Sequence, residues 1–422
     1  MRTRRLFFYG MVAGTLACTK PCIKDPINIT QSTTCSSWSR LWGGTNVDAG
    51  WAVTKTPDGG YMIAGSTYSA DGDIAVQYGK GDISITKING QGVKLWQRSF
   101  GTGEEETATA IVAAPGGGYV VLCNQSTGNS NGQLYIFKIN EAGEKLWEQT
   151  WLGPGYTVSN ALLAHGNEYV IAADCSNIED VQPWLIKLDL LGNITTQKAF
   201  GHPMRAEFPN SIVPAADGGY LVAGFTIDGA GEDAWTAKLN TFGDLEWERF
   251  TSGSDIDEWM DIIPATDGTG DYLLVGQSNS NDGDLSGNHG DYDVMIARMG
   301  AAGNVKWRRL LGGSADELGL SIIKAIDGNY VIAGTTRSGD GNLGSASPGA
   351  ENRGAWIFKI DNNGTLLSQK VLGGSLEDYP SAIINATDCG YLLVGFSLSN
   401  NGDLSGNHKE GTADMWAAKL SL

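Results

Sequence analysis

Seven copies of one short motif organise this chain and restrict the folds open to it. A tyrosine that follows a tight Gly-rich turn appears first in Asp58-Gly59-Gly60-Tyr61 and returns, in looser forms, at Tyr119, Tyr169, Tyr220, Tyr272, Tyr330 and Tyr391. The spacings between these tyrosines are 58, 50, 51, 52, 58 and 61 residues. Repeats of about this length are typical of the blades of a β-propeller whose loops vary in length.

Each repeat contains four short segments with strand character. In the first repeat they span residues 52–55, 61–65, 83–88 and 93–96. The turn chemistry of Asp-Gly-Gly joins the first two, and an Asn-Gly-Gln-Gly turn joins the last two; glycine supplies the positive φ that tight hairpins need. The repeats therefore predict an all-β fold of four-stranded units.

The seventh repeat lacks its fourth strand, because the sequence ends at Leu422 directly after the third. The missing strand has a match near the start, where Trp38 to Gly43 repeats the spacing of Trp96 to Gly101. Pairing of this N-terminal strand into the last blade would close the ring and protect the exposed strand edges. We therefore expect a seven-bladed β-propeller over residues 38–422, closed by its own first strand.

The N-terminus has the features of an export signal. Three arginines in the first five residues precede an apolar run at residues 6–16, which is followed by Ala17 and Cys18. This pattern predicts a signal peptide over residues 1–17 and lipidation of Cys18 at a bacterial lipoprotein cleavage site, with residues 18–37 as a tether. A plain secretory peptide with an unmodified cysteine is the alternative.

Besides Cys18, the chain contains five cysteines. Cys22 and Cys35 lie close together in the tether and could pair in an oxidising compartment. The remaining three, Cys123, Cys175 and Cys389, occupy unrelated positions in the repeats. None of their spacings is typical of a zinc site.

Charge and composition exclude two classes of protein. The chain carries 29 Lys and Arg against 47 Asp and Glu, a formal charge of −18, so nucleic acid, which binds basic surfaces, is not an expected partner. Hydrophobic residues make up 41 % and charged residues 18 %, which is too apolar for a disordered acidic chain. We expect a folded monomer that contacts a membrane only through its N-terminal lipid.

The motifs of the repeat resemble those of a bacterial group. The pattern Asp-Gly-Gly-Tyr, Asp-x-Trp-x-x-Lys, Gly-x-x-x-Trp and Gly-Gly-Ser, together with the loop from Asn281 to His289, is similar to propeller repeats in surface proteins and lipoproteins of Bacteroidota-type bacteria. The resemblance covers residues 38–422. It implies a propeller in the cell envelope, as an outer-membrane lipoprotein that can face the outer surface. It implies no catalytic motif, because most members of the group are uncharacterised.

A ring of carboxylates is the first candidate site. The loops between the second and third strands are long and variable, so we assign function to the face that carries them. Six of the seven repeats place an acid just before the innermost strand, at Asp48, Glu106, Glu207, Asp257, Glu317 and Asp378, whereas the third has Thr157. Asp261 adds an acid where other repeats have Ala or Ser. Such acids can bind Ca²⁺ or a hydroxyl-rich or cationic ligand, or can instead accept N–H bonds within their own turns.

A duplicated loop is the second candidate site. Asp284-Leu285-Ser286-Gly287-Asn288-His289 returns as residues 403–408, and Asp282, Asp284 and Asp403 are its candidate calcium ligands. The spacing does not match an EF-hand, and an Asx-turn with self-bonded side chains is the alternative.

These features favour a non-enzymatic, surface-exposed binding or scaffold lipoprotein whose ligand is a glycan or another envelope protein. Trp51, Tyr156 and Trp259 are candidate sugar-stacking residues, or else packing residues. The alternative is a glycan-active hydrolase or lyase that uses carboxylates such as Asp257, Asp261 and Glu317. Near-equivalent carboxylates argue against catalysis, which needs two groups with different pKa values.

Overall fold

The computed structural model describes residues 35–422, apart from 127–131, 177–180, 203–204, 228–230, 266 and 345–351. Cys35–Leu422 form one compact unit. The predicted signal peptide, the lipidation site Cys18, Cys22 and most of the tether lie outside the described residues. Among the described residues, no helix is long and apolar enough to span a membrane.

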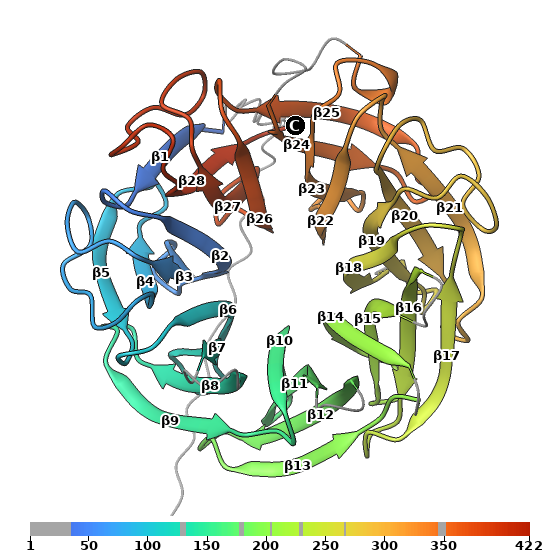
Figure 1. The fold of residues 1–422 in the computed structure, drawn as a ribbon, viewed down its shortest axis with the longest axis horizontal. Coiled ribbons are helices and arrows are strands. Elements are labelled where there is room, and N and C mark those ends of the chain that lie inside the picture. The colour runs from blue at the N-terminus through green and yellow to red at the C-terminus, as the bar shows by residue number, and fades with distance from the viewer. Residues whose placement is uncertain are drawn as a thin grey trace, which may run out of the picture. The chain divides into compact units, whose positions relative to one another are not determined.

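The unit is a seven-bladed β-propeller, as the repeats predict. Seven four-stranded antiparallel sheets stand around a central axis (Figure 1). We call the strands of a blade a to d from the axis outward. The first three blades are β2 (Asp48–Lys55), β3 (Tyr61–Thr67), β4 (Asp82–Ile88) and β5 (Lys94–Phe100); β6 (Glu106–Ala113), β7 (Tyr119–Ser126), β8 (Gly132–Ile139) and β9 (Lys145–Trp151); and β10 (Tyr156–His165), β11 (Glu168–Ser176), β12 (Val181–Asp189) and β13 (Ile194–Ala199).

The other four blades follow the same order. They are β14 (Ala206–Pro214), β15 (Tyr220–Ile227), β16 (Glu232–Leu239) and β17 (Leu245–Thr251); β18 (Asp257–Pro264), β19 (Tyr272–Ser278), β20 (Asp293–Met299) and β21 (Val305–Leu311); β22 (Glu317–Lys324), β23 (Tyr330–Thr336), β24 (Gly354–Ile360) and β25 (Leu366–Leu372); and β26 (Asp378–Asn385), β27 (Tyr391–Ser397), β28 (Asp414–Leu420) and β1 (Trp38–Trp42). A single 3₁₀ turn, Gly341–Leu343, is the only helical element in the described ranges.

The N-terminal strand closes the ring. β1 pairs antiparallel with β28, with Trp38 opposite Lys419 and Trp42 opposite Met415. Figure 1 shows β1 on the outer side of β28, in the position that strand d takes in the other blades. This confirms the predicted closure and the count of seven blades.

Tryptophans in strand d join five of the seven blades to the blade that follows. The indole of Trp96 lies over Gly143, in the c–d turn of the following blade, where an added Cβ would come within 2.8 Å of the ring. The same contact joins Trp38 to Gly92 across the closure. Blade 6 has Ser368 at this position, and the blade that follows it has no c–d turn to cover, because its strand d is β1. The closure thus accounts for the missing tryptophan of blade 6, whereas blade 3 has Thr196 and Leu185 contacts Gly243 of the next blade instead.

Each strand a is interrupted by a β-bulge in its middle. The register with strand b shifts between Gly50 and Ala52 in blade 1, and at the equivalent place in all seven blades. A bulge leaves one residue unpaired and bends the strand. The ring of strands a therefore presents its unpaired residues at the axis.

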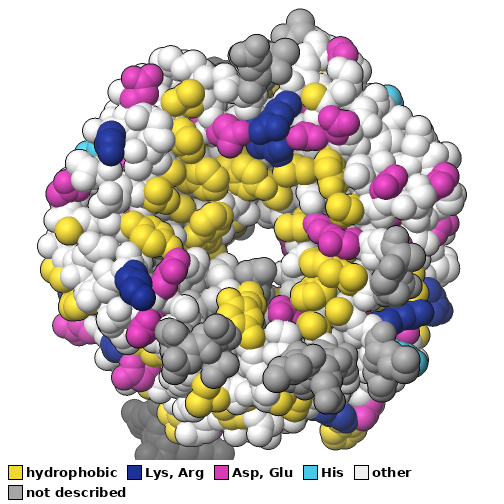
Figure 2. All heavy atoms as spheres, in the orientation of Figure 1, with side chains coloured by type: hydrophobic (Ala, Val, Ile, Leu, Met, Phe, Trp, Pro, Cys, Tyr) yellow, Lys and Arg dark blue, Asp and Glu magenta, His cyan; other side chains and the backbone are white. Residues whose placement is uncertain are grey.

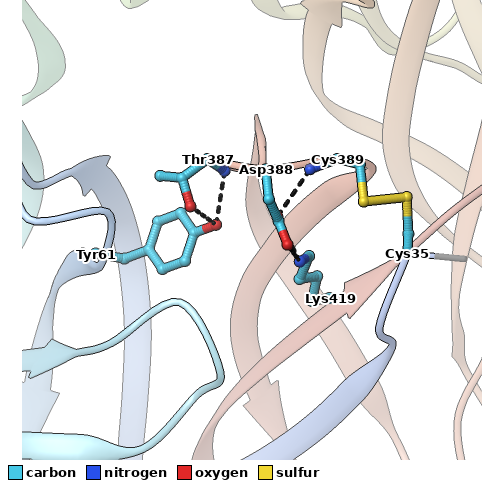
Figure 3. Close-up of a disulfide and its surroundings, with 6 residues drawn as sticks. All are labelled: Cys35, Tyr61, Thr387, Asp388, Cys389 and Lys419. Atoms are coloured by element: carbon cyan, nitrogen blue, oxygen red, sulfur yellow. Dashed lines mark hydrogen bonds and ion pairs between the residues drawn. A yellow bond between two sulfur atoms is a disulfide. The ribbon is translucent and has the colours of Figure 1, made fainter. Parts of the chain in front are cut away.

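A disulfide fixes the closure strand. Cys35 bonds to Cys389 in the a–b turn of blade 7 (Figure 3). The predicted pairing of Cys22 with Cys35 is therefore wrong, because the closure of the ring brings Cys35 to the last blade. The neighbouring Asp388 carboxylate binds the buried Lys419, and the Thr387 N–H donates to the Tyr61 hydroxyl of blade 1 at 2.9 Å. Cys123 and Cys175 are buried free thiols.

Candidate functional site

The connections of the blades divide between two faces. The a–b and c–d turns form one face, which we call the turn face, and the b–c and d–a loops form the other, the loop face. The b–c connections are long in blades 1, 5, 6 and 7, at residues 68–81, 279–292, 337–353 and 398–413. Figure 2 looks onto the loop face, where apolar side chains surround the mouth of the central opening.

The predicted ring acids stand at the inner end of the loop face, but they are buried. Asp378 shows the arrangement: its carboxylate accepts the Gly374 N–H at 2.7 Å and the hydroxyls of Ser397 and Ser399 at 2.5 and 3.0 Å. Those two serines end strand b and begin the following loop. The carboxylate therefore ties the d–a loop to the b–c loop of its own blade.

The other blades repeat this arrangement with small changes. All six ring acids have exposed fractions of 0–1 %; they are Asp48, Glu106, Glu207, Asp257, Glu317 and Asp378. Each accepts the backbone N–H of a d–a loop residue four or five positions before it. Burial raises the pKa of Asp48, Asp257, Glu317 and Asp378, against the lowering effect of their hydrogen bonds.

The ring acids thus adopt the local arrangement that was the alternative to a binding site. They do not converge on the axis, and their oxygens are occupied by donors of their own blades. A direct role for them in ligand binding stays a prediction.

Asp261 differs from the ring acids because it lies at the axis. One carboxylate oxygen accepts the Ser211 hydroxyl of blade 4 at 2.9 Å, and the other accepts the Ile322 N–H of blade 6 at 3.0 Å. The hydroxyl of Ser321 lies 3.3 Å from the second oxygen. Burial raises the pKa of Asp261, and these donors oppose the shift. Asp261 therefore bridges three blades and lies partly exposed on the channel wall.

Side chains of the duplicated loop connect it to neighbouring segments of blade 5. The Asp282 carboxylate accepts the Ser254 N–H at 2.8 Å, and Asp284 forms an ion pair with Arg308 at 2.8 Å. Leu285 and its counterpart Leu404 are buried beneath the loops.

The duplicated loop does not bring the candidate calcium ligands together. Within the described ranges, no three His, Cys, Asp or Glu side chains meet in a group that could hold a metal ion. Asp282, Asp284 and Asp403 do not come together, and calcium binding stays a prediction.

The two histidines of these loops have a defined partner. His289 Nδ1 lies 2.6 Å from the Asp293 carboxylate, and His408 Nδ1 lies 2.7 Å from that of Asp414. Both aspartates are fully buried at the start of strand c. The histidines therefore cover buried acids.

A cavity of about 820 Å³ occupies the axis. Strand a of every blade contributes to its wall, and the bulge residues supply much of the lining: Trp51, Thr109, Asn210, Met260, Leu320 and Ser381. These six side chains are of different types, although the backbone that carries them repeats. The volume lies within the ~300–1,000 Å³ range of small-molecule sites.

An aromatic shelf lies at the edge of this cavity, between blades 7 and 1. Phe396 packs edge-on against Trp51 at 5.8 Å between ring centroids and stacks on Tyr379 at 5.3 Å. The Trp51 indole N–H donates to the Ser66 hydroxyl at 3.0 Å, which fixes the ring. Tyr156 also lines the cavity and is 46 % exposed. Trp259 is fully buried and is a packing residue, so its proposed stacking on sugars is wrong.

A carboxyl pair on the loop face was not predicted from the sequence. Glu258 shares a hydrogen bond with Glu232 of the neighbouring blade, and burial together with this like charge raises the pKa of Glu258 to about 7. Gln277 donates to the Glu258 carboxyl at 2.7 Å. The pair joins blades whose b–c loops differ greatly in length, and nothing in the repeat marks it.

Comparisons with known proteins bear on the fold alone. No family model and no curated protein matches the chain. A protein of unknown function from Dyadobacter fermentans is similar with a TM-score of 0.49 and 10 % identity, over 91 % of this chain and 98 % of that one. Sqt1 from Chaetomium thermophilum is similar with a TM-score of 0.48 and 11 % identity, over 92 % and 99 % of the two chains.

Proposed function

We propose that this chain is a non-enzymatic binding module of the bacterial cell envelope, which takes a glycan or an envelope protein at its loop face. One observation supports this most directly: the axial cavity is lined by side chains that differ from blade to blade, on a backbone that repeats. A wall of this kind offers one asymmetric set of contacts, and specific recognition needs such a set.

The carboxylates favour binding over catalysis. Asp257 and Glu317, candidates for the alternative hydrolase or lyase, are fully buried and bonded to their own loops. The two carboxyls of Glu232 and Glu258 share a hydrogen bond, whereas glycosidases hold their pair at least ~5 Å apart. The hydrolase or lyase therefore ranks second.

The predicted anchor is compatible with ligand binding at the loop face. The disulfide holds Cys35 against the a–b turn of blade 7, on the turn face. If Cys18 carries the lipid, 17 residues separate it from Cys35, a reach of at most about 60 Å. A tether of this length leaves room for a ligand at the loop face.

A glycan array with the chain from Thr19 onward, which retains Cys35, tests the proposal. We expect binding without release of sugar fragments, with and without calcium as separate arms. A photo-crosslinker at Tyr156, used on native cells, reports an envelope protein instead. Tyr156→Glu on the loop face should weaken either interaction, and Phe242→Glu, at a turn-face residue that is 75 % exposed, should not. Release of products would support the hydrolase or lyase, and an effect of the turn-face variant alone would contradict the face assignment.

A further inference from the structure

We infer that the axial cavity binds the end of an uncharged oligosaccharide, with Trp51 and Tyr379 as its stacking platform and Asn124 as a hydrogen-bond donor. This inference rests on the proposed function and names the ligand class and the part of the loop face that binds it.

The charge of the cavity wall sets the class of ligand. Asp261 is the only charged residue among the lining residues described, and its oxygens already accept four donors, two backbone N–H groups and two hydroxyls. No Lys or Arg of the described chain lines the cavity, which leaves an anionic ligand without a counter-charge. Phosphorylated, sulfated and uronic-acid sugars are therefore disfavoured, and an overall charge of −18 adds to this effect.

The polar groups of the wall suit hydroxyls. Asn124 Oδ1 accepts the Ser159 N–H at 3.0 Å, and its Nδ2 has no partner in the described part of the chain. Asn210 uses Nδ2 for the Trp259 carbonyl at 2.9 Å, which leaves Oδ1 as an acceptor. The wall thus offers an amide donor and an amide acceptor, both without charge.

The aromatic shelf supplies the apolar contact. Trp51 and Tyr379 both line the cavity and are held at fixed angles by Phe396 between them. Both are half-buried, so each keeps exposed surface at the mouth of the cavity. Rigid aromatic rings present a large contact surface without loss of side-chain entropy on binding. A sugar ring can lie on this shelf while its hydroxyls meet the amides of the cavity wall.

The backbone disfavours an extended peptide as the occupant. A peptide could extend a blade only by pairing with the free edge of strand a. Every strand a carries a bulge in its pairing with strand b, for example at Trp51 and at Met260. A bulge bends the strand, so the free edge does not present the straight row of donors and acceptors that pairing needs. Side-chain contacts are therefore the main contacts available to a ligand at the axis.

Calorimetric titration with oligosaccharides of matched length tests the inference. The probes are neutral hexasaccharides of glucose, mannose and xylose, with hexagalacturonate as the acidic counterpart. We expect at least one neutral probe to bind and the acidic one not to bind. Trp51→Ala should weaken that binding at least tenfold, and Trp51→Phe should retain most of it. Asn124→Asp keeps the acceptor for the Ser159 N–H but loses the free donor, and should also cost at least tenfold. Phe242→Ala on the turn face is the matched control.

The outcomes separate this inference from the proposed function. If Tyr156→Glu abolishes glycan binding but Trp51→Ala and Asn124→Asp do not, the ligand binds the loop face without the Trp51 platform and the Asn124 donor, and the inference is wrong. A preference for hexagalacturonate, or a defined peptide bound in place of every sugar, overturns it as well and leaves the binding module intact. Melting temperatures equal to wild type for Asn124→Asp and Trp51→Phe exclude misfolding as the cause of a loss.

Discussion

The turn face and the axial cavity of this propeller use repetition in opposite ways. On the turn face of six blades, a cation in strand c forms an ion pair with an acid of the a–b turn and so fixes that turn. These cations are Lys87, Lys187, Lys238, Arg298, Lys359 and Lys419. In the cavity, the bulge position carries a different side chain in nearly every blade. Repeated residues therefore join and stabilise the blades, and unrepeated residues at a repeated backbone position mark where a ligand can be recognised.

The ring of acids shows how this comparison corrects a sequence interpretation. The acids repeat in six blades, and they are buried and bonded to the loops of their own blade. Asp261 breaks the repeat, and it alone of the predicted binding carboxylates reaches the cavity wall. The following predictions test whether the repeated set acts on stability and the unrepeated set on binding.

The largest effect is expected at the disulfide, which crosslinks the turn face of blade 7. Cys389→Gly restores the repeat motif but removes a crosslink that spans 354 residues. We expect the free energy of unfolding to fall by about 3–5 kcal/mol, because the unfolded chain regains the entropy of an open loop. Urea unfolding under non-reducing conditions measures this.

Reduction provides the control for that measurement. A reductant should destabilise the wild-type chain by a similar amount and leave Cys389→Gly unchanged. Equal stability of the two proteins without reductant would mean that β1 pairing alone holds the closure.

A ring acid should come next. Asp378→Ala leaves the Gly374 N–H and two serine hydroxyls without their acceptor, so we expect a loss of about 3 kcal/mol in urea unfolding. Asp378→Asn keeps an acceptor oxygen and should lose about half as much. Affinity per folded molecule should not change in either variant. An Asp378→Asn protein with wild-type stability and no ligand binding would return the ring to the role of a binding site.

Sequence reasoning recovered the architecture because local and periodic signals determine it. Turn glycines mark the hairpins, and the Trp38 to Gly43 spacing identified β1 as the missing strand d. The sequence also contained a signal for the burial of the ring acids. In the long-loop blades, two hydroxyl residues two positions apart stand at the end of strand b, as in Thr67 and Ser69 or Ser397 and Ser399. Their hydroxyls donate to the carboxylate of the ring acid. That pairing of acid and hydroxyls could have indicated a structural role.

The remaining features depend on contacts between repeats. Cys389 has its partner only after the ring closes, and the two cysteines stand 354 residues apart. Likewise, Glu232 and Glu258 belong to different blades, and Trp51 meets Tyr379 only through Phe396 of blade 7. Single repeats contain no information about such pairs, because the register of one blade against the next decides them.

The third prediction concerns the pH dependence of the loop face. The pKa of Glu258 is about 7 in the folded chain, above the 4.5 of an unperturbed glutamate. A raised pKa gives a contribution to stability that is complete below pH 4.5 and is lost as the pH rises through 7. Glu258→Gln should therefore equal wild type at pH 4 and be more stable by about 2 kcal/mol at pH 8.5, allowing for the partial exposure of the group.

Chemical unfolding of both proteins at the two pH values checks this. Asp327→Asn, on the turn face, is the contrasting control. In wild type, the ion pair with Lys359 lowers the pKa of Asp327. The contribution of this carboxylate to stability is therefore present above the normal aspartate pKa and is lost on acidification. A constant difference between Glu258→Gln and wild type across the range would contradict the shared hydrogen bond with Glu232.

The smallest effect is expected in the duplicated loop, where the repeated and unrepeated sets of residues meet. Asp403 lies exposed in this loop, so Asp403→Ala should change the free energy of unfolding by less than about 0.5 kcal/mol. Asp284→Ala loses a surface ion pair with Arg308 and should cost at most about 1 kcal/mol.

If these carboxylates serve only the loop, millimolar calcium should leave the melting temperatures of wild type and of both variants unchanged. A rise of several degrees in wild type that either variant abolishes would instead establish a calcium site, since a ligand that binds only the folded state raises its stability. The loop face would then hold a cation beside the proposed glycan site, and the unrepeated residues would act on stability as well as on binding.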